Sequence, residues 1–460
     1  MRSRRLAAVA GVLLLAACQS MTPSSSRPRA GDEGVLYLYL QPLAEDARGT
    51  RLTVEAVSAL HVDGREMPLA VRLRNVSADT ARRQRLLAAG PLPPGDYTGL
   101  LFRIPAAAAD EPPASPEGPA REAATRIDYR FTVRRAEGQV LAVAVKSPAA
   151  ADFHLYSPTP PATGVMGFVA NAGSGDVSVF DKKTLQVFGV IVPGHAPSGM
   201  ALDQRARRLY VALAGDDTVA VVDVLSVRVS DRIRLSPGDE PVEVALTPDG
   251  AQLLSVNRGS NTVSFIDTVS RFEVAKVRVG TSPTSITIDR TGRRAFVFGP
   301  LLNGVTVIDI LARSLVRTIP TEPGPVRGQF NRRGDRLYVV HETTPFVTVI
   351  NPATLTVMSR FSVRFPMDTI KVDPGTDYVY LGGRRTFAVS LYDSLSFAVI
   401  DAVADSGGTV NMTTDVEDNT LYLVDQAANR VLVVERIRKR RVGELDVGDG
   451  PVWISVMGES

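Results

Sequence analysis

The stretch VSVFDKKTL at residues 177–185 has an alternating apolar pattern that ends on an acidic turn, and six similar stretches follow it. They are VAVVDVLSV (219–227), VSFIDTVSR (263–271), VTVIDILAR (305–313), VTVINPATL (347–355), AVSLYDSLS (388–396) and VLVVERIRK (431–439). Each contains an acidic or amide residue after its apolar strand, and these residues are Asp181, Asp223, Asp267, Asp309, Asn351, Asp393 and Glu435. Successive positions lie 42 residues apart, except for one interval of 44. A fixed period in this range predicts a repeat architecture, in which each unit needs its neighbours to bury its apolar face.

Each repeat contains four short strands joined by tight turns. In the second repeat the expected strands are 198–202, 209–213, 218–222 and 229–235. Four strands per unit are typical of a propeller blade, because closure of the ring protects the sheet edges. The second strands carry the motifs FVAN (168–171), LYVA (209–212), LYVV (337–340) and LYLV (421–424). Over residues 165–457 the chain resembles the YVTN-type propeller repeats of bacteria and archaea.

The two ends of the repeat region complement each other. The region begins with a second strand, MGFVAN (166–171), and ends with a first strand inside GDGPVWISVMG (448–458). We therefore expect one blade with 452–456 as its inner strand and 165–192 as its three outer strands. This closure joins both chain ends and leaves no exposed edge pair for association with another sheet. The predicted fold class is all-β, a seven-bladed β-propeller preceded by a small antiparallel β-sandwich.

The sandwich is predicted from the segment before the repeats. Six stretches there alternate with period two and show no helical stripe. With the turn LPPGDY (92–97), they resemble the small transthyretin-like or immunoglobulin-like sandwiches found beside bacterial lipoprotein anchors. The predicted organisation is a signal peptide at 1–17, a flexible tether at 18–33, the sandwich at 34–150, a linker at 151–164 and the propeller at 165–460.

The N-terminus resembles a bacterial lipoprotein signal. A basic stretch, MRSRR, precedes the apolar stretch LAAVAGVLLLAA, which is too short to span a bilayer. The residues LAAC (15–18) resemble a lipobox, which implies cleavage before Cys18 and lipidation of its thiol. The alternative is an ordinary secretory peptide with an incidental cysteine. Because Gln19 stands where an aspartate would retain the lipoprotein in the inner membrane, the resemblance favours the outer membrane, facing the periplasm or the cell surface.

One face of the predicted ring gathers polar residues around the channel. In a propeller, the turns that enter first strands and the turns that join second to third strands lie on the same face. The first set has a Gly-x-x-Pro pattern, which serves the backbone because Gly permits positive φ and Pro fixes an extended entry. The second set varies, as binding loops do. The candidate channel-mouth residues are His195, Arg258, His341, Glu342, Arg384, Arg385, Asp425 and Arg430. They form either a polar or anion-binding pocket or ordinary solvated turns.

The opposite face is more basic. Its candidate residues are Arg205, Arg207, Arg208, Arg293, Arg294, Arg332, Arg333, Arg438, Lys439 and Arg440. Clustered arginines attract anionic lipid headgroups or polyanions. The alternative is solubility charge in turns, diluted by neighbouring acids such as Asp203 and Asp289. The net charge of the chain is only +3, so we expect no nucleic-acid partner.

Signatures of catalysis are scarce in this chain. One cysteine and four histidines leave no haem-attachment motif and no cluster with zinc spacing. No Gly-x-Ser-x-Gly elbow or phosphate loop occurs. We expect no metal and no cofactor, and assign no catalytic residue.

The leading hypothesis is a non-catalytic binding or scaffold protein, lipid-anchored in the cell envelope, whose partner is a protein or small ligand. The alternative is a propeller enzyme of the lactonase, haem d1-like or quinoprotein-like type acting at the channel mouth.

Overall fold

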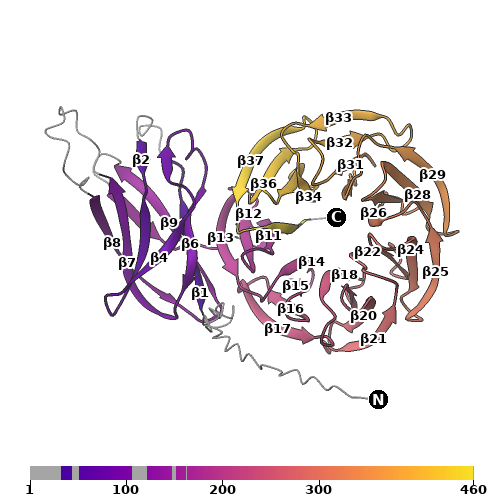
Figure 1. Ribbon diagram of the computed structural model, residues 1–460, viewed down its shortest axis with the longest axis horizontal. Coiled ribbons are helices and arrows are strands. Elements are labelled where there is room, and N and C mark those ends of the chain that lie inside the picture. Colours follow the sequence, from indigo (N-terminus) through magenta and orange to yellow (C-terminus); the bar gives the residue numbers. More distant parts are fainter. Residues whose placement is uncertain (1–32, 44–50, 106–121, 148–151, 162, 459–460) are drawn as a thin grey trace, which may run out of the picture.

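The computed structural model describes residues 33–43, 51–105, 122–147, 152–161 and 163–458 and shows two β-rich parts side by side (Figure 1). The first part, which we call the N-terminal β-domain, precedes a ring of seven four-stranded sheets. Cys18, on which the predicted lipid anchor depends, lies outside the described residues. Among the residues that the structure describes, no helix has the length and apolar character needed to cross a membrane.

Eight strands of the N-terminal β-domain form one continuous sheet, in the order β10-β9-β1-β6-β4-β3-β7-β8. They are β1 (Gly34–Leu40), β3 (Ala56–His61), β4 (Glu66–Val71), β6 (Arg85–Leu92), β7 (Gly95–Pro105), β8 (Glu122–Val133), β9 (Gly138–Ser147) and β10 (Asp152–Tyr156). Two short strands, β2 (Arg51–Thr53) and β5 (Asn75–Ser77), pair only with each other.

This sheet folds over on itself around a single apolar core. Leu38 of β1 and Leu141 of β9 share that core with Leu100 of β7. Phe102 and Phe153, from opposite ends of the strand order, stack with their ring centroids 5.1 Å apart. The two halves face each other as in a sandwich, but β4 pairs with both β3 and β6 and so joins them into one sheet. The β1–β9 pair is parallel, which differs from the purely antiparallel pairing predicted from the sequence.

The propeller consists of seven antiparallel blades, which confirms the predicted all-β fold. Blade 1 contains β38 (Pro451–Val456), β11 (Met166–Asn171), β12 (Asp176–Asp181) and β13 (Gln186–Ile191). Blade 2 contains β14 (Pro197–Asp203), β15 (Arg208–Leu213), β16 (Thr218–Asp223) and β17 (Arg228–Arg234). Blade 3 contains β18 (Pro241–Leu246), β19 (Gln252–Asn257), β20 (Thr262–Asp267) and β21 (Glu273–Arg278). Blade 4 contains β22 (Ser285–Ile288), β23 (Arg294–Phe298), β24 (Gly304–Asp309) and β25 (Ser314–Pro320).

The remaining blades repeat the same order from inner to outer strand. Blade 5 contains β26 (Pro325–Phe330), β27 (Leu337–His341), β28 (Phe346–Asn351) and β29 (Thr356–Ser362). Blade 6 contains β30 (Thr369–Val372), β31 (Val379–Gly382), β32 (Val389–Tyr392) and β33 (Val399–Val403). Blade 7 contains β34 (Thr409–Asp415), β35 (Thr420–Asp425), β36 (Arg430–Glu435) and β37 (Arg440–Asp446). A 3₁₀ turn, η2 (Thr163–Val165), leads into blade 1.

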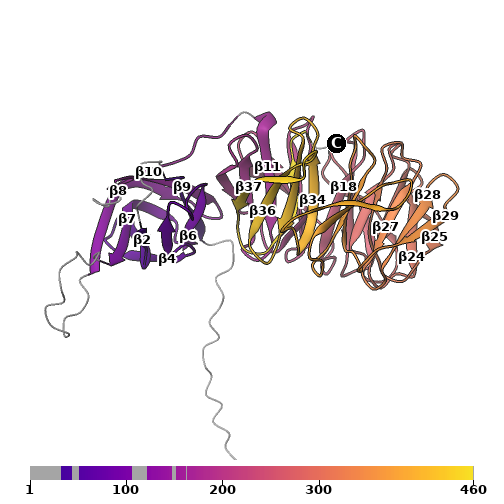
Figure 2. The same ribbon diagram turned by 90° about the horizontal axis from the view of Figure 1, so that it is seen from above.

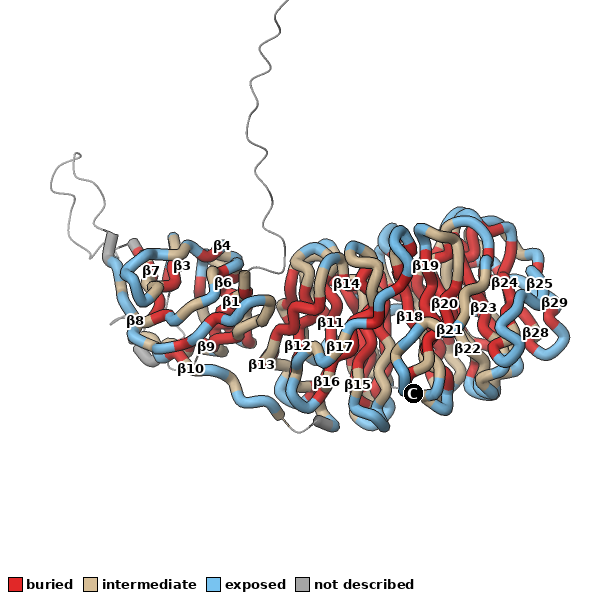
Figure 3. The backbone as a smooth tube through the Cα atoms, turned by 90° about the horizontal axis from the view of Figure 1, so that it is seen from below, coloured by how far each residue is buried: buried red, intermediate tan, exposed pale blue. Residues whose placement is uncertain are grey.

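Blade 1 closes the ring as the sequence predicted. Its inner strand β38 pairs antiparallel with β11, so that Val456 lies opposite Gly167 and Ile454 opposite Val169. The C-terminal end of the chain and the start of the repeats therefore share one sheet. Figure 2 shows the ring from the side, and Figure 3 shows that the second and third strands of the blades are mostly buried, while many turns at both faces and the outer strands of several blades are exposed. The ring has two flat faces of exposed turns around a strand-lined channel.

The repeated acidic residues hold the turns between third and fourth strands, as predicted. Asp181 Oδ1 accepts a hydrogen bond from Lys183 N at 2.7 Å, and Asp223 Oδ1 accepts one from Ser226 N at 2.7 Å. Such backbone bonds stabilise the charged form of the carboxylate. They lower the pKa below its ordinary value at Asp223, Asp267, Asp393 and Glu435. These residues serve the backbone and are not a row of ligands.

The N-terminal β-domain packs tightly against the outer wall of blade 1. Tyr37, Tyr39 and Val140 share an apolar cluster with Val187 and Val190 of β13. At Gly138, the first residue of β9, an added Cβ would lie 2.3 Å from the Val190 carbonyl oxygen. Only glycine permits this approach of the two backbones. The two parts therefore touch closely along β9 and β13, beside a pocket of about 490 Å³ that residues of both parts line.

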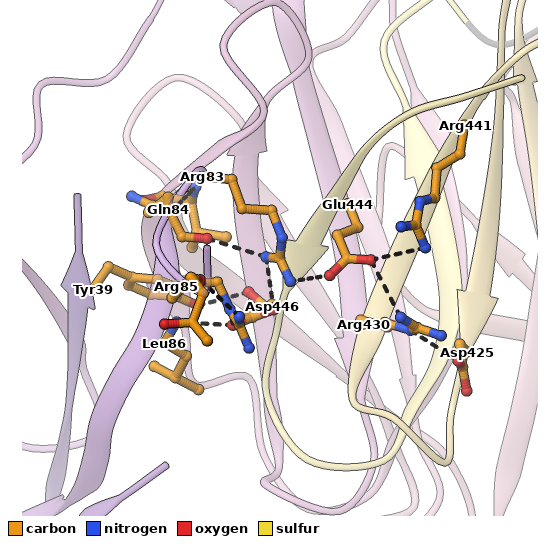
Figure 4. A network of polar contacts seen from close by, with 12 residues as sticks. Tyr39, Arg83, Gln84, Arg85, Leu86, Asp425, Arg430, Arg441, Glu444 and Asp446 are labelled. Atoms are coloured by element: carbon orange, nitrogen blue, oxygen red, sulfur yellow. Dashed lines mark hydrogen bonds and ion pairs between the residues drawn. The ribbon is translucent and has the colours of Figure 1, made fainter. Parts of the chain in front are cut away.

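Polar groups complete the interface at the end of β37 (Figure 4). Asp446 accepts hydrogen bonds from Arg85 Nε at 2.7 Å and from Leu86 N at 3.1 Å, and Arg83 Nη1 lies 2.8 Å from its Oδ1. Arg83 also pairs with Glu444. Deeper in the interface, Tyr37 Oη donates to Asp176 Oδ2 at 2.5 Å. Burial raises the pKa of the Asp176 carboxyl group.

Candidate functional site

The turns lie on two faces of the ring, as the sequence predicted. On each face, backbone hydrogen bonds join neighbouring turns of the same blade. On the first, Arg258 N donates to Glu240 O at 3.1 Å, linking two turns of blade 3. We call this side, which carries the turns that enter the inner strands, the mouth face. On the opposite side, Ile310 N donates to Arg293 O at 2.8 Å. We call that side the basic face.

Three of the predicted channel-mouth residues pair the two mouth turns of their own blade. His195 Nδ1 lies 2.6 Å from Asp216 Oδ1. Arg258 and Arg384 make equivalent pairs, at 3.3 Å with Glu240 and at 3.4 Å with Asp368. Exposed ion pairs contribute at most about 1 kcal/mol each. These three side chains hold the two mouth turns of a blade together, and each pair adds little to stability.

The other predicted mouth residues are spread over different surroundings. Glu342 and Arg385 are exposed on the mouth face. Arg430 Nε lies 3.0 Å from Asp425 Oδ2, and its Nη1 lies 3.2 Å from Glu444 Oε2 (Figure 4). Because Glu444 pairs with Arg83 of the N-terminal β-domain, Asp425 and Arg430 belong to the domain interface.

His341 is completely buried inside blade 5. Its Nε2 lies 2.9 Å from Thr348 Oγ1 on the neighbouring strand. Asparagines take the same place in two other blades, where Asn171 donates to Ser178 at 2.9 Å and Asn257 donates to Ser264 at 2.7 Å. His341 thus replaces a structural amide between the second and third strands. Burial lowers its pKa from the ordinary value of 6.5 to about 4, so the ring is neutral at pH 7.

We expect the buried ring of His341 to make the protein less stable below pH 6.5. Because the pKa is about 4 in the folded state, the unfolded chain binds more protons between pH 6.5 and 4, and stability falls as pH falls. The loss should approach about 3 kcal/mol near pH 4. The variant His341→Asn keeps a donor for Thr348 and should lack this component. Urea unfolding of both proteins at several pH values measures it, and identical slopes in that window would contradict the prediction.

The channel contains two chambers that meet at a layer of three side chains. The chamber on the mouth face has a volume of about 260 Å³ and is lined by residues from all seven blades, including Glu342 and Arg384 of the predicted channel-mouth residues. The chamber toward the basic face has a volume of about 410 Å³ and includes Lys371 in its lining. Glu243 of β18, Arg327 of β26 and Trp453 of β38 line both chambers. These three side chains therefore mark the boundary between them.

Arg327 reaches across the channel to both other members of this layer. Its Nη2 lies 3.5 Å from Glu243 Oε2, and its guanidinium carbon lies 4.8 Å from the centroid of the Trp453 ring. Glu243 Oε1 accepts hydrogen bonds from Ser285 Oγ at 3.1 Å and from Ile286 N at 3.2 Å. Glu243 Oε2 has no hydrogen-bond partner among the described residues. Burial raises the pKa of this carboxyl group, and Arg327 opposes that effect.

This layer was not among the residues predicted from the sequence. Equivalent positions of the seven inner strands hold Gly199, Glu243, Ser285, Arg327, Thr369, Asn411 and Trp453. They follow the same repeat period as the turn acids. An alignment of the seven repeats would therefore have placed two charged residues and the only tryptophan at one position, and this is the signal for the layer. At Gly199 an added Cβ would lie 2.6 Å from Glu243 Cα, so glycine leaves room for the strand that carries Glu243.

Within the described residues, no group of three or more His, Cys, Asp or Glu side chains is placed to hold a metal ion. The charged layer of the channel contains one carboxylate and one guanidinium, and Lys371 lies on its basic-face side. This arrangement can bind polar groups of both signs.

No protein-family model matches the chain, and no curated protein matches it. Solved structures do match. Hydrazine synthase from Kuenenia stuttgartiensis has a TM-score of 0.50 and 20% identity, over 55% of this chain and 87% of that one. Dihydro-heme d1 dehydrogenase NirN in complex with DHE has a TM-score of 0.51 and 14% identity, over 65% and 78%. A functionally unknown protein from Desulfotomaculum acetoxidans DSM 771 has a TM-score of 0.57 and 14% identity, over 63% and 98%. At such identities the likeness shows the propeller fold alone.

Proposed function

We propose that this protein is a non-catalytic binding protein of the cell envelope, whose propeller holds a small polar ligand in its channel. One observation carries the proposal: Glu243 is 5% exposed and lines both chambers of the channel, and its Oε2 has no hydrogen-bond partner among the described residues, with only the Arg327 guanidinium 3.5 Å away. A buried polar atom without a partner costs about 1–3 kcal/mol, and more if it is charged. A ligand that donates a hydrogen bond to this oxygen would remove that cost.

The surrounding charges indicate the chemistry of the ligand. A hydroxyl or ammonium group would satisfy Glu243, and an acidic group would pair with the guanidinium of Arg327. The mouth chamber, at about 260 Å³, is smaller than most drug-sized sites. We therefore favour a molecule the size of an amino acid or a sugar acid.

Fluorescence of Trp453 provides a direct test, because it is the only tryptophan in the chain. We expect saturable changes of its emission with members of a panel of free amino acids and sugar acids such as galacturonate. The variants Glu243→Gln and Arg327→Gln should raise the dissociation constant of such a probe at least about tenfold, since each removes one charged partner.

The matched control is Glu66→Gln, which changes an exposed carboxylate of the N-terminal β-domain. It should leave the dissociation constant unchanged. A folded protein whose Trp453 emission responds to no member of the panel would exclude this ligand class. Equal affinities of wild type and Glu243→Gln would exclude this position in the channel.

We further infer that acyl chains on Cys18 hold the protein in the outer membrane. The support is the lipobox-like sequence LAAC with Gln19 after it. Stable anchoring requires more than one acyl chain or a second membrane signal. Labelling with radioactive palmitate should mark the wild type and not Cys18→Ser, and the variant should leave the membrane fraction.

A further inference from the structure

An exposed apolar rim surrounds the basic face. The residue two positions after the repeated acid is a large aliphatic side chain in five of the seven blades. Their exposed fractions are Leu225 52%, Val269 86%, Leu311 88%, Leu395 75% and Ile437 74%. The position lies in the turn that enters each outer strand, so it recurs at the same height around the ring.

The outer strands extend this rim. Further exposed apolar side chains lie in or beside the same turns, near the starts of β21, β25, β29, β33 and β37. They are Phe272, Val274, Leu315, Val316, Val357, Met358, Val399, Ile400 and Val442. Exposed apolar side chains that recur at one level around a ring are more typical of an interaction surface than ones scattered singly. The N-terminal β-domain covers the outer wall of blade 1, while the rim follows blades 2 to 7.

Arginines fill the basic face inside this rim. None of the following exposed residues makes an ion pair with a residue that the structure describes: Arg205, Arg207, Arg293, Arg332, Arg333 and Arg440. The neighbouring acids are occupied by the backbone. Asp203 accepts from Ala206 N at 2.8 Å, and Asp289 accepts from Arg293 N at 3.0 Å. The carboxylates are drawn into the turns, and the guanidinium groups stay free to contact an anionic surface.

We propose that the basic face and its apolar rim dock flat onto an anionic lipid bilayer. The arginines would contact the headgroup phosphates, and the aliphatic rim would enter the boundary with the acyl chains. The shape allows this contact, because the N-terminal β-domain lies beside the ring and leaves both flat faces uncovered (Figures 1 and 2). The mouth face then points away from the bilayer with its chamber open. Docking onto the bilayer does not require a ligand in the channel.

The test uses the mature chain with Cys18→Ser, so that no acyl chain contributes to binding. In flotation, it should bind vesicles of phosphatidylglycerol and phosphatidylethanolamine at least tenfold more tightly than phosphatidylcholine vesicles. The fourfold variant Arg205→Gln, Arg207→Gln, Arg332→Gln, Arg333→Gln should bind at least tenfold more weakly and lose most of the salt dependence. The rim variant Leu311→Ser, Leu395→Ser, Ile437→Ser should lose the binding that persists at high salt.

The matched control is Arg65→Gln, Arg82→Gln, Arg126→Gln, Arg130→Gln, which removes the same charge from the N-terminal β-domain. It should change vesicle binding less than twofold, and all variants should unfold at the same denaturant concentration as the parent chain. Absence of binding to anionic vesicles at low salt would overturn the proposal. That result is expected if this face binds a protein partner instead. Undiminished binding by the rim variant at high salt would also overturn it.

Discussion

Replacing Lys182 by methionine is expected to lower the free energy of unfolding by about 3–5 kcal/mol, the largest effect of any single change considered. The Lys182 side chain is 1% exposed and pairs with Asp415, which is completely buried. Its Nζ also donates to the carbonyl oxygen of Met457 at 2.5 Å. The ammonium group thus joins the third turn of blade 1, the inner strand of blade 7 and the end of the chain. Without it, the Asp415 carboxylate stays buried with no cation beside it.

Chemical denaturation monitored by Trp453 measures this loss, because the tryptophan lies on β38 in the closing blade. The matched control is Lys183→Met, which breaks the exposed pair with Asp418 and should cost about 1 kcal/mol or less. The double variant Lys182→Met, Asp415→Asn should recover part of the loss, since an amide leaves no buried charge. A cost below about 1 kcal/mol for Lys182→Met would show that water reaches Asp415 and that the pair does not close the ring.

The variant Asp446→Ala is expected to destabilise the protein by about 2–4 kcal/mol and to uncouple the N-terminal β-domain from the propeller. In the wild type, the Asp446 carboxylate pairs with the partly buried Arg83 and Arg85 and accepts a hydrogen bond from the backbone N–H of Leu86 (Figure 4). Removing it leaves two guanidinium groups against the wall of blade 7 with fewer partners. Because Arg83 keeps Glu444, the loss is smaller than for a fully buried pair.

Calorimetry checks this second result, with one cooperative transition expected for the wild type and two for Asp446→Ala. The segment between β10 and η2 should also become more sensitive to protease. Asp231→Ala is the control, because it breaks a partly exposed pair with Arg271 that joins blades 2 and 3 and does not involve Asp446, and it should cost about 1 kcal/mol or less. A single transition with wild-type protease resistance in Asp446→Ala would mean that the apolar contacts alone couple the two parts.

The fold follows from signals that act over short distances along the chain. The 42-residue period, the alternation within strands and the turn residues are all local, and they recur seven times. Closure was also predictable, since a repeat region that begins at a second strand and ends at a first strand leaves one solution that buries both edges. The role of the repeated acids followed because an aspartate at a turn bonds the nearby backbone whichever fold surrounds it.

The site was less predictable, because the groups that meet there lie on different blades. Variation among the turns directed attention to the mouth residues. His195, Arg258 and Arg384 pair with acids of their own blade, and only Glu342 and Arg384 among the predicted mouth residues line the mouth chamber. His341 suggested chemistry by its residue type, but its neighbours Thr348 and Pro323 belong to a buried strand pair and an adjoining turn. Asp425 and Arg430 lie at a turn of blade 7 that the N-terminal β-domain engages through Glu444, which no repeat pattern indicates.

By itself, the sequence determined the all-β class, the number of blades, their closure and the job of the turn acids, because each depends on residues close together in the chain. Only the tertiary structure decided which side chains face one another. Glu243, Arg327 and Trp453 meet because the ring brings three distant inner strands to one channel, and the two tyrosines of β1 meet blade 1 because β9 begins at a glycine that lets the backbones touch. Contacts across the ring depend on its closure, and closure is a property of the whole chain.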